Sequence, residues 1–230
     1  MITAVMQPYL FPYIGYYQLI LASDYFVFYD DVNYIKRGYI NRNNILLDGE
    51  AHRFTIPVPG ASQNKLISNL EFSDEISKIL DTISHAYKKA PNYNDVISIV
   101  KRVLGQKDRD ITSVCISGVK AVFDYLSLDG PNLLRSTNIN YDRNKSAADK
   151  LISITKELKC SDYVNSPGGK ELYEKGYFLS ENVALHFIEP KIKEYTQGGS
   201  NFVPYLSIID VLMWCDKETV IKLLNSYNLN

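Results

Sequence analysis

The first segment of the chain constrains its fold more than any other, because a strand, a helix and a second strand follow one another closely there. Ile2–Met6 is a short apolar run typical of a buried strand, and residues 15–22 carry apolar side chains at helical spacing. Asp24 ends that helix, and residues 25–29 are an aromatic and β-branched run suited to a strand. Parallel strands need a crossover of about a dozen residues or more, and this spacing supplies it. The segment therefore predicts a parallel strand, helix, strand unit.

The rest of the chain continues this alternation, apart from one helical stretch. Further strands are expected at 52–58, 136–140, 162–165 and 183–188, and further helices at 73–89, 94–104, 110–126, 145–158, 169–175, 206–215 and 217–227, with a loop over 30–44. We expect a three-layer α/β fold with a mainly parallel, Rossmann-like sheet and a helical insertion or lobe at about 73–127. With 230 residues the chain is long enough for one core, so we expect a single domain over 1–230.

Composition and charge exclude several classes of function. Lys and Arg number 25 against 26 Asp and Glu, so no general basic field attracts nucleic acid. No stretch approaches the roughly 20 apolar residues that cross a bilayer, and the start has no basic leader region. We expect a soluble, cytoplasmic protein. The cysteines are far apart in apolar surroundings, which predicts buried free thiols, and no histidine pair has zinc-site spacing, so no metal site is expected.

The run MQPYLFPYIGY at 6–16 is the first candidate for a binding site. Its prolines and aromatic residues follow the first strand, at the carboxyl edge of the sheet where open α/β folds bind ligands. A glycine at the start of the next helix lets a ligand approach closely, and a helix N-terminus attracts anions such as phosphate. The alternative is a stiff, packed connection. We assign substrate binding to Gln7, Tyr9, Tyr13 and Gly15, and a catalytic role to Tyr16.

This run resembles the signature region of the nucleotidylyltransferase and class I synthetase superfold. In that group a first strand leads into His-x-Gly-His at the head of a helix, and a second strand follows the helix. Here Tyr13-Ile14-Gly15-Tyr16 occupies that place, so tyrosines stand at both histidine positions. A tyrosine hydroxyl can donate a hydrogen bond to phosphate, but it lacks the positive charge of an imidazolium. The usual adenylate or nucleotidyl chemistry of the group therefore does not carry over directly.

Residues 29–43 form the second candidate, because acidic and basic side chains lie close together in an expected loop. Adjacent carboxylates at the end of a strand can bind a metal, orient an amine or accept a hydrogen bond from a ribose. Lys and Arg side chains suit phosphate or carboxylate groups. The alternative is a surface loop whose acids and bases pair with each other. We assign catalysis to Asp30 and Asp31, and substrate binding to Lys36, Arg37, Asn41 and Arg42.

Later segments supply further candidates for substrate binding. Lys145 and Ser146 stand where a helix is expected to begin, and the glycines at 168–169 would expose backbone N–H groups to a phosphate. Helix capping and a glycine-rich turn explain these features equally well. Tyr195 and Gln197 lie in a polar loop that suits sugar hydroxyl groups or the edge of a nucleobase.

Several runs taken together are similar to the WbqC-like family. They are MQPYLFPYIGYYQLI at 6–20, DYFVFYDDVNYIKRGYINRN at 24–43, YKKAP at 87–91, SDY at 161–163 and LSIID at 206–210. The similarity extends over nearly the whole chain. It implies membership of a bacterial family associated with O-antigen and other surface-polysaccharide pathways, and therefore work on nucleotide-activated sugars. The family supplies no catalytic residues to carry over, so the roles assigned above are our own inference.

These observations lead to a hypothesis about the reaction. We expect a transferase that attaches an acyl or aminoacyl group to the amine of a nucleotide-linked amino sugar, with a carboxylate near that amine. The cofactor is left open, with ATP and Mg²⁺ as candidates, and an aminoacyl-tRNA is one candidate donor. The alternatives are a nucleotidylyltransferase and a non-catalytic nucleotide-sugar-binding or scaffold protein. The sequence leaves the sugar, the donor and a homo-oligomeric state undecided.

Overall fold

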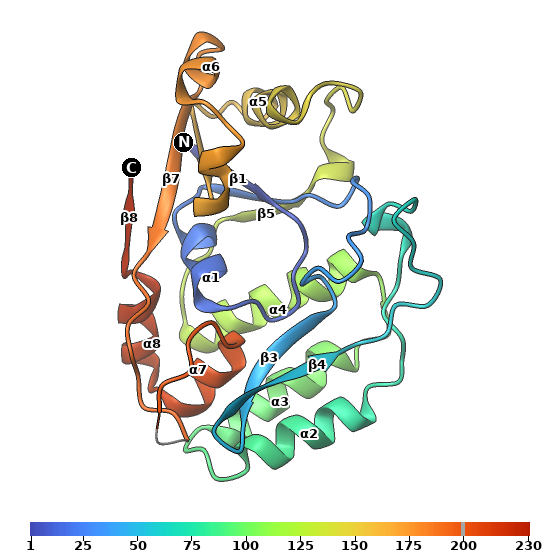
Figure 1. Ribbon diagram of the computed structural model, residues 1–230, viewed down its shortest axis with the longest axis vertical. Coiled ribbons are helices and arrows are strands. Elements are labelled where there is room, and N and C mark those ends of the chain that lie inside the picture. Colours follow the sequence, from blue (N-terminus) through green and yellow to red (C-terminus); the bar gives the residue numbers. More distant parts are fainter. Residues whose placement is uncertain (199–200) are drawn as a thin grey trace.

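A six-stranded sheet forms the centre of the protein (Figure 1), whose computed structural model describes residues 1–198 and 201–230. Its strands are β1 (Ile2–Met6), β2 (Tyr25–Phe28), β5 (Asn132–Arg135), β6 (Asp162–Asn165), β7 (Ala184–Pro190) and β8 (Tyr227–Leu229). They are ordered β5-β2-β1-β6-β7-β8, and neighbours are parallel except for β7 and β8. The expected mainly parallel, Rossmann-like α/β fold is confirmed.

The sheet reverses its winding between β1 and β6. From β1 the chain moves outward through β2 to β5, then returns across the sheet to β6 and continues in the other direction to β7. The loops that follow β1 and β6 therefore leave the sheet on opposite sides and open a crevice between them. Open α/β sheets bind their ligands at such a point, outside the carboxyl ends of the strands.

Helices cover both faces of the sheet, as Figure 1 shows. They are α1 (Ile14–Leu21), α2 (Ser77–Tyr87), α3 (Tyr93–Leu104), α4 (Ile111–Leu126), α5 (Ala147–Glu157), α6 (Lys175–Ser180), α7 (Ile208–Trp214) and α8 (Lys217–Leu224). On one face α1 packs against α8, and the rings of Tyr17 and Phe123 bring α1 and α4 together at 6.3 Å. On the other face α5 and α6 enclose a second buried cluster, where Tyr163 and Phe178 stack at 5.7 Å. Strands that are apolar on both faces require this three-layer arrangement.

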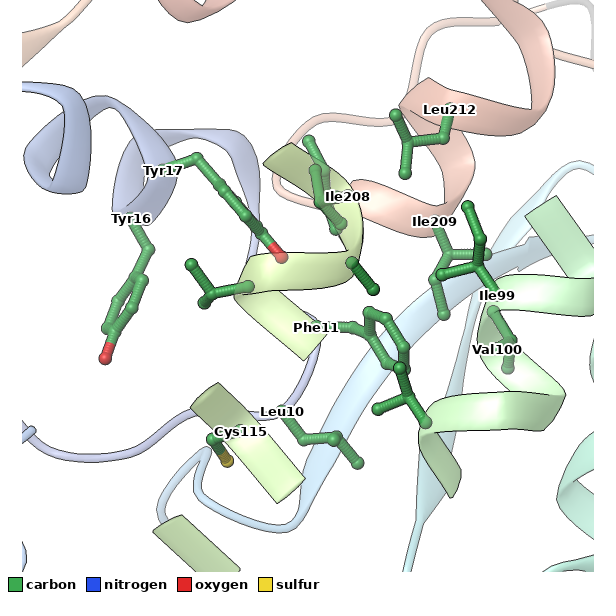
Figure 2. Close-up of a cluster of buried hydrophobic side chains, with 14 of the residues drawn as sticks. Leu10, Phe11, Tyr16, Tyr17, Ile99, Val100, Cys115, Ile208, Ile209 and Leu212 are labelled. Atoms are coloured by element: carbon green, nitrogen blue, oxygen red, sulfur yellow. The ribbon is translucent and has the colours of Figure 1, made fainter. Parts of the chain in front are cut away.

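The helices expected between 73 and 127 are present as α2, α3 and α4. α3 packs against α2, α4 and α7, and a single buried cluster extends from α1 through these helices. Figure 2 shows part of that cluster, with Leu10 and Phe11 of the N-terminal run among side chains of α3, α4 and α7. The helical region therefore shares its core with one face of the sheet, and it packs directly on the run that follows β1.

A β-hairpin of β3 (Arg42–Leu47) and β4 (Glu50–Thr55) corrects two expectations. The loop expected over 30–44 ends where β3 begins, and the strand expected at 52–58 begins and ends earlier. The hairpin turn is Asp48-Gly49, with φ angles of 52° and 82°. Positive φ at both central residues is the type I′ geometry that Asp-Gly favours between two strands. This dipeptide is the sequence signal that predicts the hairpin.

Replacing Gly49 is expected to weaken this turn. Gly49→Ala places a side chain on a φ of 82°, where an L-residue is strained, although its Cβ would meet nothing within 4 Å. We expect the free energy of unfolding to fall by about 1 kcal/mol, measured by urea denaturation. Gly176→Ala in α6 is the control, since a Cβ there also meets nothing within 4 Å and carries no such strain. Equal stability of the two variants would contradict the turn geometry.

Three further boundaries differ from expectation. The strand expected at 136–140 lies at 132–135 and is followed by a 3₁₀ turn. In place of the helix expected at 169–175 there is a 3₁₀ turn at Pro167–Glu171. The helix expected at 217–227 ends at Leu224. β5 lies at 132–135 because all four of its residues pair in register with β2, and β8 forms because it pairs with the end of β7. Pro167 favours a tight turn at its position. Partners far along the chain set these boundaries, so local propensity does not reveal them.

Two simpler expectations concern single features. Cys115, Cys160 and Cys215 are buried and free, as predicted. Within residues 1–198 and 201–230, no helix is long and apolar enough to cross a membrane.

Candidate functional site

A cleft of about 580 Å³ opens at the switch point, between the carboxyl ends of β1 and β6. Its walls come from β1 and the run after it, from α1, from the loop after β2, and from the segment after β6. They include Gln7, Tyr9, Tyr13, Gly15, Tyr16, Tyr29, Ile35, Gly38, Tyr39, Ile40, Tyr163, Asn165, Ser166, Gly168, Gly169 and Tyr173. The cleft therefore lies at the edge of the sheet that the sequence indicated.

The two segments singled out in the sequence meet in this cleft. Every residue assigned in the first run lines it, from Gln7 to Tyr16. The second segment contributes Tyr29 and the apolar and aromatic members of residues 35–40, but none of its assigned charged residues. The rings of Tyr9 and Tyr39 join the two segments, with centroids 5.5 Å apart. The two segments therefore share one cleft, and the wall that they form there is aromatic.

Hydrogen bonds from distant parts of the chain hold the N-terminal run in place. The Tyr16 hydroxyl donates to the Gln7 carbonyl at 2.8 Å. The Asn43 amide donates to the Phe11 carbonyl at 2.5 Å, and the Ser207 hydroxyl donates to the same carbonyl at 2.7 Å. Phe11 itself has a φ of 41°, a strained value that its surroundings must maintain. This wall is fixed before a ligand arrives, which lowers the entropy lost on binding.

Tyr13 covers the beginning of α1. A Cβ at Gly15 would clash with the outer part of the Tyr13 ring, so a larger residue there would displace that ring. The space above Gly15 is thus filled by a side chain of the protein, where the sequence suggested close approach of a ligand. Tyr13 in turn presents its half-buried ring to the cleft.

The opposite wall is the segment that follows β6. Asn165 is 6% exposed, and its side-chain oxygen accepts a hydrogen bond from the Ser166 N–H at 2.8 Å. A Cβ on Gly169 would lie 2.5 Å from the Asn165 amide nitrogen, so a larger residue there would displace the Asn165 side chain. A Cβ on Gly168 would meet nothing within 4 Å, so backbone at this position faces open space. The expected turn at 168–169 therefore borders the cleft, with an amide group beside it.

The cleft carries no formal charge along its wall. Among the described residues that line it there is no Lys, Arg, His, Asp or Glu, and the ionisable groups are tyrosines. Burial raises the pKa of Tyr9, Tyr13 and Tyr29, so these hydroxyl groups are neutral at physiological pH. Such a surface suits an uncharged ring with hydroxyl groups better than it suits a phosphate.

The basic residues assigned in the second segment lie in a different hollow, of about 330 Å³. Lys36, Arg37, Asn41 and Arg42 line it together with residues of the hairpin and of the segment after it. Residues 35–42 thus contribute to two hollows, with apolar and aromatic members on the cleft and charged members on the other. The sequence predicted the grouping of these basic side chains, but not their separation from the cleft.

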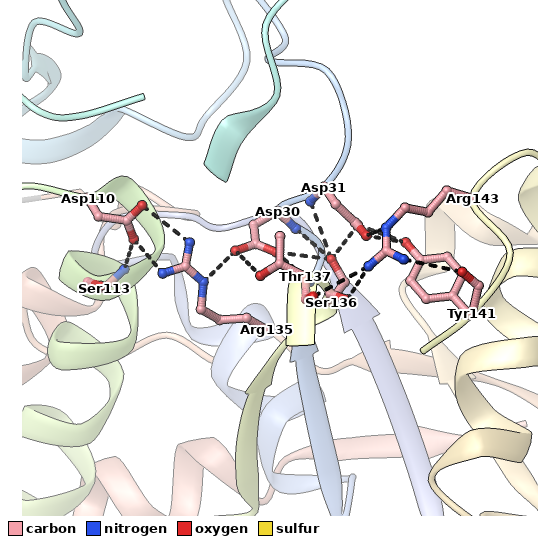
Figure 3. A network of polar contacts seen from close by, with 9 residues as sticks. All are labelled: Asp30, Asp31, Asp110, Ser113, Arg135, Ser136, Thr137, Tyr141 and Arg143. Atoms are coloured by element: carbon pink, nitrogen blue, oxygen red, sulfur yellow. Dashed lines mark hydrogen bonds and ion pairs between the residues drawn. The ribbon is translucent and has the colours of Figure 1, made fainter. Parts of the chain in front are cut away.

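Asp30 belongs to a buried network that Figure 3 shows. Its carboxylate accepts hydrogen bonds from Arg135 Nε at 2.6 Å, from the Ser136 hydroxyl at 3.1 Å and from the Thr137 N–H at 3.1 Å. Arg135 also binds Asp110, which caps α4, at 2.9 Å. The Asp30 side chain is 0% exposed and does not line the cleft. This arrangement ties the end of β2 to β5 and α4.

Asp31 is also engaged, on the opposite side of Ser136. It accepts hydrogen bonds from the Tyr141 hydroxyl at 2.7 Å and from Arg143 Nε at 2.7 Å, and its side chain is 3% exposed. Its negative charge contributes to the raised pKa of Tyr29, after the larger effect of burial, so it lies close to one wall of the cleft. The catalytic roles assigned to both carboxylates stay predictions.

The remaining assigned residues lie away from the cleft. The Ser146 side chain accepts from the Asp149 N–H at 3.2 Å and so caps α5, the alternative considered for it, and Lys145 beside it is exposed. Tyr195 and Gln197 both donate to the buried Asp210, at 2.7 and 2.9 Å. These contacts fix the polar loop against α7, so neither group points into the cleft.

Comparison with known proteins decides the family. A model described as the WbqC-like protein family matches residues 7–222. The chain belongs to the WbqC-like family. An uncharacterized protein of Mycobacterium tuberculosis, Rv1507c, is 22% identical over 214 residues, which cover 91% of each chain. No solved structure matches.

Two asparagines of this WbqC-like chain were not recognised in the sequence as parts of the site. Asn165 ends β6 on the cleft, and Asn43 supports the N-terminal run from β3. The end of a parallel strand next to β1 is itself a signal for Asn165, because carboxyl ends meet at one edge. Asn43 gave no local signal, because its role depends on hydrogen bonds to the carbonyls of Leu10 and Phe11, more than thirty positions earlier in the chain.

Proposed function

We propose that this WbqC-like protein is a transferase that modifies a nucleotide-linked amino sugar, by moving an acyl or aminoacyl group onto the sugar amine. The observation that supports it most is the neutral, tyrosine-rich cleft at the switch point of a Rossmann-like sheet. Tyrosine pairs an apolar ring face with a hydroxyl, which suits the alternating apolar and polar surface of sugars and nucleobases. The amides of Gln7 and Asn165 would supply directional hydrogen bonds.

An apolar cleft also favours the chemistry of an amine. The nucleophile is the neutral amine, and removal from water disfavours its protonated form, so the pKa of a bound sugar amine falls. In the transfer a carbon–nitrogen bond forms as the bond from the acyl carbon to its leaving group breaks, and the amine proton leaves to the leaving group or to solvent. In this proposal Asp31 acts as a positioning residue behind Tyr29, and activation of the acyl donor by ATP with Mg²⁺ stays part of the hypothesis.

A second candidate is a binding protein without turnover. The uncharged wall of the cleft favours it, because no carboxylate, imidazole or ammonium among the described lining residues can exchange a proton with a bound ligand. Incubation with nucleotide-linked amino sugars, glycine or acyl donors and ATP, followed by mass spectrometry, separates the candidates. A mass increase on the sugar supports transfer, whereas a thermal shift with unchanged ligand across the panel supports binding alone.

Gly168 offers a test of the cleft itself. Gly168→Val places a side chain in the wall of the cleft, at a position where an added Cβ meets nothing within 4 Å. We expect the affinity for the nucleotide-linked sugar to fall at least about tenfold, with a smaller loss for Gly168→Ala, while the unfolding temperature changes little. Gly176→Val is the matched control, because that glycine is equally open but does not line the cleft. Unchanged affinity in Gly168→Val would remove the cleft from the proposal.

A further inference from the structure

Positive charge gathers in the hollow beside the hairpin, apart from the cleft. Lys36, Arg37 and Arg42 line it together with Tyr34 and Asn41. Among the described residues no Asp or Glu lines this hollow, and no ion pair uses any of these basic side chains. The charge is therefore uncompensated within the described part of the chain and available to an anion.

Arg42 is held in an orientation that leaves its outer nitrogens free. Its Nε donates to the Gly38 carbonyl at 2.5 Å, a bond that does not involve the two terminal nitrogens. Those two N–H₂ groups, fixed in the plane of the guanidinium, fit two oxygens of one phosphate. Arg42 lines the hollow together with Tyr34, and its positive charge partly offsets the rise that burial causes in the pKa of Tyr34.

The floor and rim of the hollow are also fixed. The Tyr34 hydroxyl donates to the Asn41 side-chain oxygen at 2.9 Å, and the Asn41 amide donates to the Ile56 carbonyl at 2.7 Å. Arg37 has a φ of 64°, in the left-handed region that residues other than glycine rarely adopt. Strain of this kind persists only where surrounding structure maintains it, and it collects at ligand sites.

We propose that this hollow binds the diphosphate group of a ligand, at a site distinct from the neutral cleft. The basic side chains that line it match the several negative charges of a diphosphate, whereas the cleft has no charged group to meet them. Residues 35–42 form part of both hollows, so a ligand in one lies against a shared segment of chain. The inference does not depend on the reaction proposed for the cleft.

Calorimetric titration with inorganic pyrophosphate at low ionic strength tests the site. The unchanged protein is expected to bind, and Arg42→Gln to bind at least about tenfold more weakly, because it loses a charged, bidentate contact. Lys36→Gln and Arg37→Gln are expected to weaken binding several-fold. Arg53→Gln removes the same charge from an exposed position on β4 of the same hairpin, outside the hollow, and is expected to leave the affinity unchanged.

Controls keep the test decisive. Arg42→Lys retains the charge but loses the planar fork, so an intermediate affinity supports the site even if Arg42→Gln folds poorly by circular dichroism. A nucleoside diphosphate should compete with pyrophosphate, and the free nucleoside should not, while Gly168→Val should leave pyrophosphate binding unchanged. Three results would overturn the proposal: no binding by the unchanged protein, equal losses in Arg42→Gln and Arg53→Gln, or competition by the nucleoside alone.

Discussion

Arg135→Ala is expected to lower the free energy of unfolding by about 3–5 kcal/mol, because it leaves a buried carboxylate without its cation. Asp30 has a side chain that is 0% exposed, and its Oδ2 lies 2.6 Å from Arg135 Nε. The same guanidinium binds both oxygens of Asp110, at 2.9 and 3.2 Å, so its removal also loosens the cap of α4. Urea denaturation followed by circular dichroism measures the loss.

A double variant separates the charge from the packing. Arg135→Ala leaves the Asp30 charge unpaired, and Asp30→Asn removes that charge. The double variant should therefore regain part of the stability that Arg135→Ala loses. Arg53→Ala removes an exposed arginine from β4 and serves as the control, with an expected change of less than about 0.5 kcal/mol. If Arg135→Ala costs no more than this control, the network in Figure 3 contributes little to the fold.

This network also explains why the sequence pointed to Asp30 and Asp31 without revealing their contacts. Adjacent carboxylates at the end of a strand are a pattern shared by catalytic sites and by buried networks. Their partners, Arg135, Ser136 and Arg143, lie more than a hundred positions later in the chain. Those partners meet the carboxylates only because β5 pairs in parallel with β2. Sequence spacing therefore predicted that the two carboxylates lie at the carboxyl edge of the sheet, but not that they are buried in ion pairs and hydrogen bonds.

The cleft was easier to predict than the charged loop, for a geometric reason. Residues 7–16 follow β1 directly, so the position of that strand in the sheet places them at the switch point. Side chains of residues 35–42 are divided between two hollows, and that division depends on the local path of the chain, including the positive φ of Arg37. The strand order therefore predicts where the cleft lies, whereas the binding roles assigned to residues 7–16 stay predictions.

Asp210→Ala is expected to destabilise the protein by more than about 3 kcal/mol, because several buried donors lose their acceptor at once. The Asp210 carboxylate is 0% exposed and accepts from the Tyr87 hydroxyl at 2.8 Å, from Tyr195 at 2.7 Å and from Gln197 at 2.9 Å. These bonds join α2, α7 and the polar loop. Asp210→Asn keeps the shape of the side chain and should cost less, since it loses one acceptor but buries no charge.

The same carboxylate predicts how stability depends on pH. Burial raises the pKa of Asp210 above its ordinary value, against the opposing effect of hydrogen bonds from Tyr195, Tyr87 and Gln197. The folded state therefore binds this proton more tightly than the unfolded state does, so stability falls as pH rises from the ordinary carboxyl pKa to the raised one. Hydrogen bonds lower the pKa of Asp162, so its contribution to stability is lost only at a pH below the range in which Asp210 titrates.

Unfolding free energies measured between about pH 4 and pH 7 would therefore rise toward the acidic end in the unchanged protein and stay flatter in Asp210→Asn. The Asp24→Asn variant provides a matched control, because Asp24 is exposed and its substitution removes the same charge from the surface. A pH profile of Asp210→Asn that parallels that of the unchanged protein would show that another group is responsible. If the difference is found, the charge on Asp210 is maintained at neutral pH at a cost in stability. Such a cost has a physical reason here, because only a carboxylate can accept hydrogen bonds from all three donors that hold the polar loop on α7.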